Sequence, residues 1–269
     1  VERRNMSTKQ DILTMAADAK KASLVLGNAP TKEKNRAIRL MAKNISKNAA
    51  YILRENKKDI KTARGKKIKS SLVDRLELDH KRVQGMVSSL EAIAKLDDVV
   101  GRVSQIKQRP NGLVIGKMRV PIGVIGIIYE ARPNVTSDCV GLCLKSGNSV
   151  ILKGGSEALN SNIAIFKCLR NAVSKTSIPK EAIAFIASKD RKAVKELLKL
   201  NQYVDLIMPR GGEGLIEEVI KNSRIPVIKH YKGVCHVYVD DDADLNMAEK
   251  VCFNAKVQRP SVCNSMETL

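Results

Sequence analysis

Cys263 lies where a thiol can serve as a nucleophile. It follows Arg259-Pro260-Ser261-Val262 and precedes Asn264-Ser265, so it stands between a proline turn and small polar residues rather than in an apolar stripe. Such a thiol can be reached and ionised, and the thiolate is the reactive form. Because an ordinary thiol is only about 3% ionised at pH 7, a helix amino end, a cation or a cofactor must assist it. The alternative, on these residues alone, is a loop thiol without a chemical role.

Asn134, Lys153 and Arg210 lie near the ends of apolar runs that are predicted to be buried strands. From Pro121 onward the pattern alternates between strand and helix. The predicted strands are 122–129, 149–153, 182–186 and 204–208, and the predicted helices are 135–145, 157–174, 191–200 and 214–221. This alternation predicts a parallel sheet covered by helices, in which sites form at the carboxyl ends of the strands. We expect the three polar residues, each just beyond such an end, to meet at one crevice.

Two glycine pairs, Gly154-Gly155 and Gly211-Gly212, fall between predicted strands and helices. The chain contains no Gly-x-Gly-x-x-Gly sequence, so spacing alone does not identify a dinucleotide site. Backbone N–H groups in such turns, next to a helix amino end, favour phosphate. Tight turns without a ligand are the alternative.

The remaining sequence is typical of an ordered α/β protein, with 43% hydrophobic residues among 269. Residues 7–97 show helical periodicity, with Thr31 as a candidate helix cap, and residues 104–119 predict a hairpin around Pro110-Asn111-Gly112. No signal peptide is recognisable at the start, and no run approaches the ~20 apolar residues of a membrane span. We therefore expect a cytoplasmic protein. Its six cysteines are expected to be free thiols, and no metal site is predicted.

The formal net charge of +20 favours polyanions as partners. Aromatic residues make up only 3% of the chain and Trp is absent, which leaves few platforms for stacking bases. Steering of anionic substrate and cofactor is the functional interpretation that we prefer. A lysine-rich surface that keeps the protein soluble, or a basic protein that binds nucleic acid non-specifically, are the alternatives.

Separated segments of the chain match one family in sequence and in order. Besides the run around Cys263, they are Val120–Thr136, Lys145–Ala158, Asp205–Gly212 and Lys229–Asp240. They resemble the gamma-glutamyl phosphate reductases of the aldehyde dehydrogenase superfamily. The resemblance implies an aldehyde-dehydrogenase-like α/β fold: a Rossmann-type parallel sheet, a helical N-terminal region, an oligomerisation hairpin and the start of a second α/β catalytic domain. The implied boundaries are 1–103 and 120–229 for the cofactor-binding domain, 104–119 for the hairpin and 230–269 for the N-terminal part of the catalytic domain.

The resemblance also implies a reaction, the second step of proline biosynthesis. NADPH reduces L-glutamyl 5-phosphate to L-glutamate 5-semialdehyde and phosphate through a thioester on Cys263, while the Asn134 amide and the Cys263 N–H receive the negative charge of the carbonyl oxygen. Lys153, with Ser156 nearby, is expected to favour NADP(H). The other implied cofactor residues are Gly154, Gly155, Arg210, Gly211 and Gly212.

His230 stands where hydrolytic aldehyde dehydrogenases carry a glutamate that activates water, so hydrolysis of the thioester is expected to be slow. Proton relay, contact with phosphate, and a purely structural role are all open for His230. Arg132 and Arg259 are candidates to grip phosphate or carboxylate, with ordinary ion pairs as the alternative.

The resemblance further implies a homo-oligomer formed through residues 104–119, and glutamate 5-kinase is a candidate partner. Members of the family continue well past the nucleophile, so we expect these 269 residues to be a fragment that binds cofactor weakly and turns over poorly. Another acyl substrate of the aldehyde dehydrogenase superfamily, or an inactive basic fragment, are the alternative functions.

Overall fold

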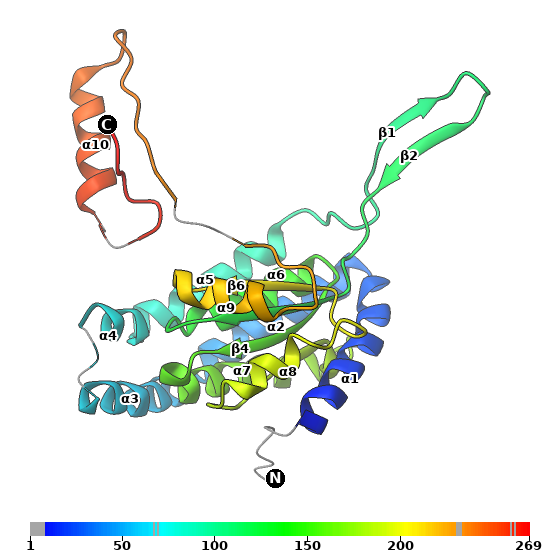
Figure 1. Cartoon of the computed structure of the whole chain (residues 1–269), viewed down its shortest axis with the longest axis horizontal. Coiled ribbons are helices and arrows are strands. Elements are labelled where there is room, and N and C mark those ends of the chain that lie inside the picture. Colours follow the sequence, from blue (N-terminus) through cyan, green and yellow to red (C-terminus); the bar gives the residue numbers. More distant parts are fainter. Residues whose placement is uncertain (1–8, 67, 69, 230–232, 259, 261) are drawn as a thin grey trace. The chain divides into compact units, whose positions relative to one another are not determined.

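The computed structural model describes residues 9–66, 68, 70–229, 233–258, 260 and 262–269. The chain forms two compact units, Val1–Lys229 and His230–Leu269 (Figure 1). In the first unit the helices are α1 (Lys9–Gly27), α2 (Thr31–Lys47), α3 (Ala49–Gly65), α4 (Ser70–Leu76), α5 (His80–Lys95), α6 (Asn134–Lys145), η1 (Ser156–Ala158), α7 (Leu159–Val173), η2 (Lys180–Ala182), α8 (Lys192–Leu197) and α9 (Glu213–Asn222). Its strands are β1 (Val103–Gln108), β2 (Val114–Met118), β3 (Val124–Tyr129), β4 (Ser149–Gly154), β5 (Ile183–Phe185) and β6 (Leu206–Arg210).

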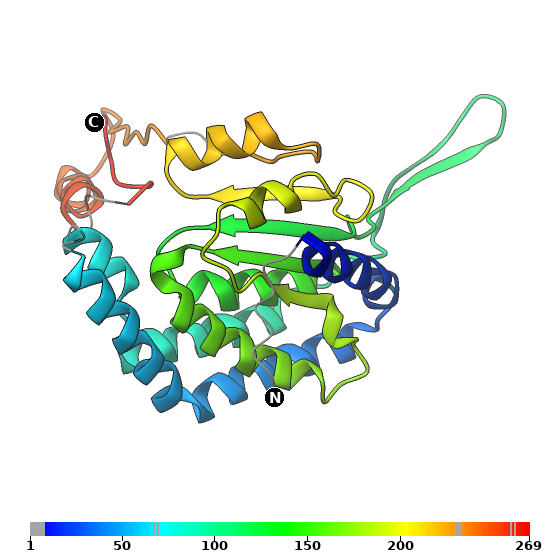
Figure 2. The same cartoon turned by 60° about the horizontal axis from the view of Figure 1, so that its bottom comes forward.

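The predicted parallel sheet is confirmed, with the strand order β5-β4-β3-β6. Every pairing in it is parallel, and β3 and β4 are buried along their whole length. Alternate residues of β3 serve opposite faces: Ile125 and Ile127 join the core formed with α2, α5, α6 and α7, whereas Val124 and Ile128 join the core formed with α1, α8 and α9. Figure 2 shows these helical layers on the two sides of the sheet.

Strand β6 begins and ends two residues later than the predicted range 204–208. The predicted range left out Pro209 and Arg210, but both pair with β3. Pro209 is tolerated because the neighbouring segment on the outer side of β6 bonds only to Ile207, so the missing N–H of Pro209 interrupts no ladder.

The predicted hairpin is present as the antiparallel pair β1 and β2, and all its strand residues are exposed (Figure 1). The base of the hairpin is tied to α2 through Asp98. The Asp98 carboxylate lies 2.5 Å from Lys34 Nζ and accepts hydrogen bonds from Thr31 Oγ1 and the Val100 N–H. Burial opposes ionisation of Asp98, but these bonds outweigh it and lower its pKa. Thr31 is therefore the first residue of α2 and a partner of Asp98, not the predicted cap.

Asp59 of α3 caps a helix that lies far from it in sequence. Its buried carboxylate accepts bonds from the backbone N–H groups of Asn160 and Ser161, at 3.3 and 2.8 Å, in the first turn of α7. The Asn160 amide and the Ser161 hydroxyl donate to the same carboxylate at 2.8 and 2.6 Å. Asn56, one turn earlier on α3, accepts a bond from the Leu78 N–H. Helix α3 thus fixes the start of α7, just beyond the end of β4.

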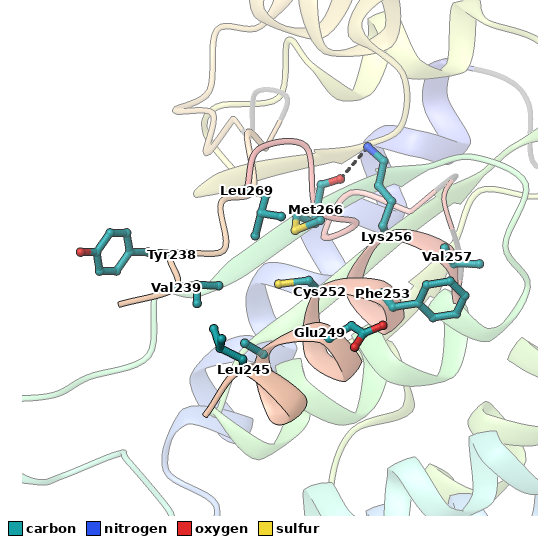
Figure 3. Close-up of a pocket in the computed structure, with 11 residues that line it drawn as sticks. Tyr238, Val239, Leu245, Glu249, Cys252, Phe253, Lys256, Val257, Met266 and Leu269 are labelled. Atoms are coloured by element: carbon teal, nitrogen blue, oxygen red, sulfur yellow. Dashed lines mark hydrogen bonds between the residues drawn. The ribbon is translucent and has the colours of Figure 1, made fainter. Parts of the chain in front are cut away.

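The second unit contains α10 (Leu245–Val257), which Asp244 caps through the N–H groups of Asn246 and Met247. The end of the chain runs beside residues 235–237, with a bridge between His236 and Thr268. A mainly apolar groove of about 790 Å³ lies along α10. Figure 3 shows the residues that line it. No helix in the described residues is long and apolar enough to cross a membrane.

We predict that Asp59→Ala lowers the free energy of unfolding by about 2–4 kcal/mol, because it removes a cap and leaves buried donors without an acceptor. Urea denaturation followed by circular dichroism measures this. The control is Glu91→Ala on the exposed face of α5, for which a change within about 0.5 kcal/mol is expected. Equal stability of the two variants would contradict the role of Asp59.

Candidate active site

The carboxyl ends of β4, β3 and β6 lie side by side. Tyr129, the last residue of β3, pairs with Gly154 on one side and Arg210 on the other. Arg210 is therefore the last residue of β6, and Lys153 is the last but one of β4. Both had been predicted to lie just beyond the strand ends. Asn134 opens α6, the helix that follows β3. The sheet thus brings the predicted residues of the first unit to one edge.

A buried hydrogen-bonded chain fixes this edge. The Tyr129 hydroxyl lies 2.7 Å from Thr136 Oγ1, which donates to Asn162 Oδ1 at 3.1 Å. Burial raises the pKa of Tyr129, so the phenol stays protonated. A Cβ at Gly154 would lie 2.2 Å from Asn162 Nδ2, so only glycine fits there. These side chains join the end of β3, the start of α6, the start of α7 and the end of β4.

The Asn134 amide is held by its own helix. Its Nδ2 donates to Asp138 Oδ2 at 3.1 Å, and Asp138 accepts a second bond from Ser89 of α5. An amide NH₂ carries two donors, and among the described residues no acceptor takes the second. Asn134 can therefore keep its orientation while it donates to another oxygen.

Glu130 lies against the glycine pair that follows β6. Its Oε2 accepts a bond from the Gly212 N–H at 2.9 Å, directly before α9. A Cβ added to Gly211 would lie 2.6 Å from the Glu130 carboxyl carbon. The first turn of α9 is the kind of site that favours an anion, and Glu130 already supplies one. An external phosphate that takes the Gly212 N–H has to displace it.

Glu157 of η1 holds the neighbouring turn, between β3 and α6. Its Oε1 accepts a bond from the Ala131 N–H at 2.7 Å. Ala131 has φ +30°, a conformation that costs free energy for a residue with a Cβ. The same carboxylate fills the space in which a Cβ of Gly155 would lie. A residue held in such a conformation beside the candidate site is typical of functional sites.

Lys153 is buried, and its Nζ donates to the Gly154 carbonyl at 2.8 Å. Burial lowers its pKa, and the charge of Glu157 opposes this shift. Ser156 is exposed beside it. The neighbouring helix α7 likewise has its amino end capped by a carboxylate, that of Asp59, so an anion that binds at either glycine-rich turn meets an acidic side chain already in place.

Cys263 lies in the second unit and is exposed. Its main-chain carbonyl accepts a bond from Cys235 Sγ at 3.3 Å. His230 and Arg259 lie outside the described residues. Arg132 is exposed in the turn before α6.

Glu130 and Glu157, which hold the loops, were not predicted as site residues. Their only signal was position: Glu130 directly follows a buried strand, and Glu157 follows Gly154-Gly155. Thr136 and Asn162 were not predicted either, because no spacing motif links Thr136 to Tyr129, seven residues before it, or to Asn162, 26 residues after it.

Comparisons with known proteins agree with the resemblance to the gamma-glutamyl phosphate reductases. The enzyme of that name from Thermodesulfovibrio yellowstonii is 53% identical over 264 residues, 98% of this chain and 63% of that protein. The crystal structure of the Thermotoga maritima enzyme has 46% identity and a TM-score of 0.88, over 95% of this chain and 62% of that one. The Saccharomyces cerevisiae enzyme has 31% identity and a TM-score of 0.76, over 98% and 65%. The chain spans about 63% of the length of the curated relatives that it matches.

The predicted fold is confirmed by these structures, which share the mixed helical and parallel-sheet architecture. The family model of the aldehyde dehydrogenases matches residues 2–269, and the chain therefore belongs to the aldehyde dehydrogenase family.

Proposed function

We propose that the protein reduces L-glutamyl 5-phosphate to L-glutamate 5-semialdehyde with NADPH and releases phosphate, in the second step of proline biosynthesis. The observation that carries this proposal is the 53% identity with a gamma-glutamyl phosphate reductase over 98% of the chain. The exposed position of Cys263 supports it further. Cytoplasmic location is part of the same proposal.

Cys263 acts as the nucleophile. Its thiolate attacks the acyl carbon of the substrate, phosphate leaves, and the acyl group remains on sulfur as a thioester. Phosphate is a good leaving group, so the thiolate displaces it directly. No activated water takes part in this step. His230 remains a proposed proton relay or phosphate contact.

Asn134 donates to the oxygen on which negative charge develops, together with the Cys263 N–H. The bond to Asp138 orients its amide before substrate arrives. Removing one such donor typically lowers the rate on the order of 10²- to 10³-fold.

The cofactor site consists of the edge residues Lys153, Gly154, Gly155, Ser156, Arg210, Gly211 and Gly212. When bound, NADPH supplies the hydride that reduces the thioester. Arg210 is exposed at the end of β6, beside the amino end of α9, and can pair with phosphate. The Lys153 ammonium has three donors, of which the Gly154 carbonyl takes one, so it can also donate to a ribose or phosphate. Glu130, in contrast, must leave the Gly212 N–H.

Two partners belong to the proposal. The exposed hairpin joins copies of the protein, and glutamate 5-kinase supplies the acyl phosphate. An acyl phosphate is reactive toward water, which favours direct delivery from the enzyme that makes it.

The test of the reaction is reduction of NADP⁺ by glutamate 5-semialdehyde, run with and without phosphate on the native protein. We expect activity that requires phosphate, and a loss on the order of 10³-fold or more in Cys263→Ser. Cys139→Ser is the matched control, because burial and then the charge of Asp138 raise the pKa of Cys139 to about 12. A native protein without phosphate-dependent reduction would remove the proposal, and faster reaction of other aldehydes would favour a different acyl substrate.

The position of Glu130 leads to a prediction about affinity. Glu130→Gln should bind NADPH up to about five-fold more tightly, because it removes a competing negative charge worth up to about 1 kcal/mol. Titration of NADPH fluorescence measures the dissociation constant. Glu217→Gln removes the same charge from an exposed site one turn into α9 and should leave the constant unchanged. Weaker or equal binding by Glu130→Gln would show that Glu130 does not compete with the cofactor.

The hairpin leads to a prediction about assembly. Ile106 is 66% exposed on β1, so Ile106→Asp should remove an apolar contact from the interface between copies, put a charge in its place and yield monomers. Light scattering during gel filtration measures the mass. Ser104→Asp, on the same strand, adds the same charge without removing an apolar side chain and should keep the oligomer. Identical masses for wild type and Ile106→Asp would exclude the hairpin as the interface.

A further inference from the structure

In the second unit, the thiol of Cys235 contacts the main chain of Cys263 from an adjoining segment. Cys235 Sγ donates to the main-chain carbonyl of Cys263 at 3.3 Å. Cys235 is half-buried and Cys263 is exposed. A disulfide spans Cα separations of about 4.4–6.8 Å, and it needs the Cys263 side chain to turn toward the Cys235 thiol that already lies against its carbonyl. The exposed Cys263 side chain has room to turn.

The backbone holds these segments together. The N–H groups of Glu267 and Thr268 both donate to the Cys235 carbonyl, at 2.8 and 3.2 Å, and the Val237 N–H donates to the Thr268 carbonyl at 3.0 Å. The residues that follow Cys263 are therefore paired with those around Cys235.

Gly233 adds a second constraint on the same pair. A Cβ at this position would lie 2.9 Å from the Cys263 carbonyl oxygen and 3.6 Å from Cys235 Sγ. Any larger residue would push the segment of Cys235 away from Cys263. The glycine thus permits the close approach of the two cysteines.

The other cysteines lack these properties. Burial raises the pKa of Cys139 to about 12 and that of Cys168 to about 11, and it raises the pKa of Cys143 as well. A thiol with a raised pKa is seldom ionised and reacts slowly with oxidants. Cys252 is buried on α10. Oxidation is therefore directed to Cys263.

We propose that Cys235 is a resolving thiol that forms a reversible disulfide with Cys263 when the protein meets a peroxide. The Cys263 thiolate attacks one oxygen of the peroxide and breaks the O–O bond, so that sulfur is oxidised to a sulfenic acid and the peroxide is reduced to hydroxide or alkoxide. The Cys235 thiolate then attacks the Cys263 sulfur, and the sulfenic oxygen leaves as water after taking a proton. The disulfide prevents further oxidation of Cys263, and a dithiol reductant restores both thiols.

The consequence for activity rests on the proposed function, in which Cys263 must be free to carry the acyl group. The cross-link itself does not depend on that function. Its chemistry can therefore be tested in this chain without a turnover assay.

The experiment treats the reduced protein with one equivalent of hydrogen peroxide and maps tryptic peptides without reduction. Cys235 and Cys263 fall in separate peptides, 233–250 and 257–269, each of which contains one cysteine. We expect a mass lower by two hydrogens, a cross-link between these peptides, and its loss after dithiothreitol. Cys139→Ser is the control variant and should form the same cross-link.

Cys235→Ser separates the two steps. This variant should give no cross-link and should accumulate a sulfenic acid on Cys263 that dimedone traps, followed by sulfinic and sulfonic acid. The proposal is overturned if wild-type Cys263 passes to sulfinic acid as fast as in Cys235→Ser. It is also overturned if the wild-type cross-link joins other cysteines, or if Cys263→Ser places the sulfenic acid on Cys235 at the wild-type rate. The wild-type peptide map decides the matter even if a variant fails to fold.

If the cross-link forms but the native protein shows no phosphate-dependent reduction, the proposed function fails and the thiol pair stands. If the native protein shows phosphate-dependent reduction but hydrogen peroxide does not cross-link Cys263 to Cys235, the proposed function stands and the proposed disulfide fails.

Discussion

Strand β3 is hydrogen-bonded on both sides, to β4 and to β6, and the position of each candidate residue in the first unit depends on that register. Tyr129 stands between Gly154 and Arg210 because the three strands are parallel and in step. The amino end of β3 is fixed by Asp205, whose carboxylate accepts a bond from the Val124 N–H at 2.8 Å and binds Lys20 of α1 at 2.7 Å. A shift of one residue would move buried side chains to the wrong face of the sheet. The sheet therefore places the carboxyl edge on which Asn134, Lys153 and the glycine turns depend.

Acidic side chains fix the loops of this basic protein. Asp59, Glu130 and Glu157 each accept bonds from main-chain N–H groups at the starts of helices or in turns. Charge-assisted bonds of this kind are among the stronger ones in proteins. With 28 acidic against 48 basic residues, the acids are scarce, and several are placed where backbone donors converge. The basic side chains and these three carboxylates thus serve different purposes: the basic side chains attract anions, and the carboxylates shape the turns at which an anion can bind.

The sequence predicted the elements well where local pattern decides them. The alternation from Pro121 onward gave the parallel strands and the helices between them, and Pro110-Asn111-Gly112 marked the hairpin. The predicted range of β6 was two residues too early at both ends. Proline usually ends a strand, but Pro209 lies in an edge strand, where its missing N–H interrupts no hydrogen bond between strands. Thr31 was also predicted to cap a helix, but its hydroxyl donates a hydrogen bond to Asp98, 67 residues later in the chain. Contacts such as Asp59 with Ser161, or Glu130 with Gly212, join residues that no local pattern connects. The roles of the site residues remain predictions for the same reason, and His230 lies outside the described residues.

The buried contact between Lys34 and Asp98 has a mechanical consequence. The Lys34 side chain is 1% exposed, so separating it from Asp98 would leave a charge in the interior without its counter-ion, a costly state. The contacts of Asp98 thus anchor the foot of the hairpin to α2, whereas the residues of both hairpin strands are exposed. A force applied at the tip is therefore expected to separate the exposed strands before it breaks the contact between Lys34 and Asp98.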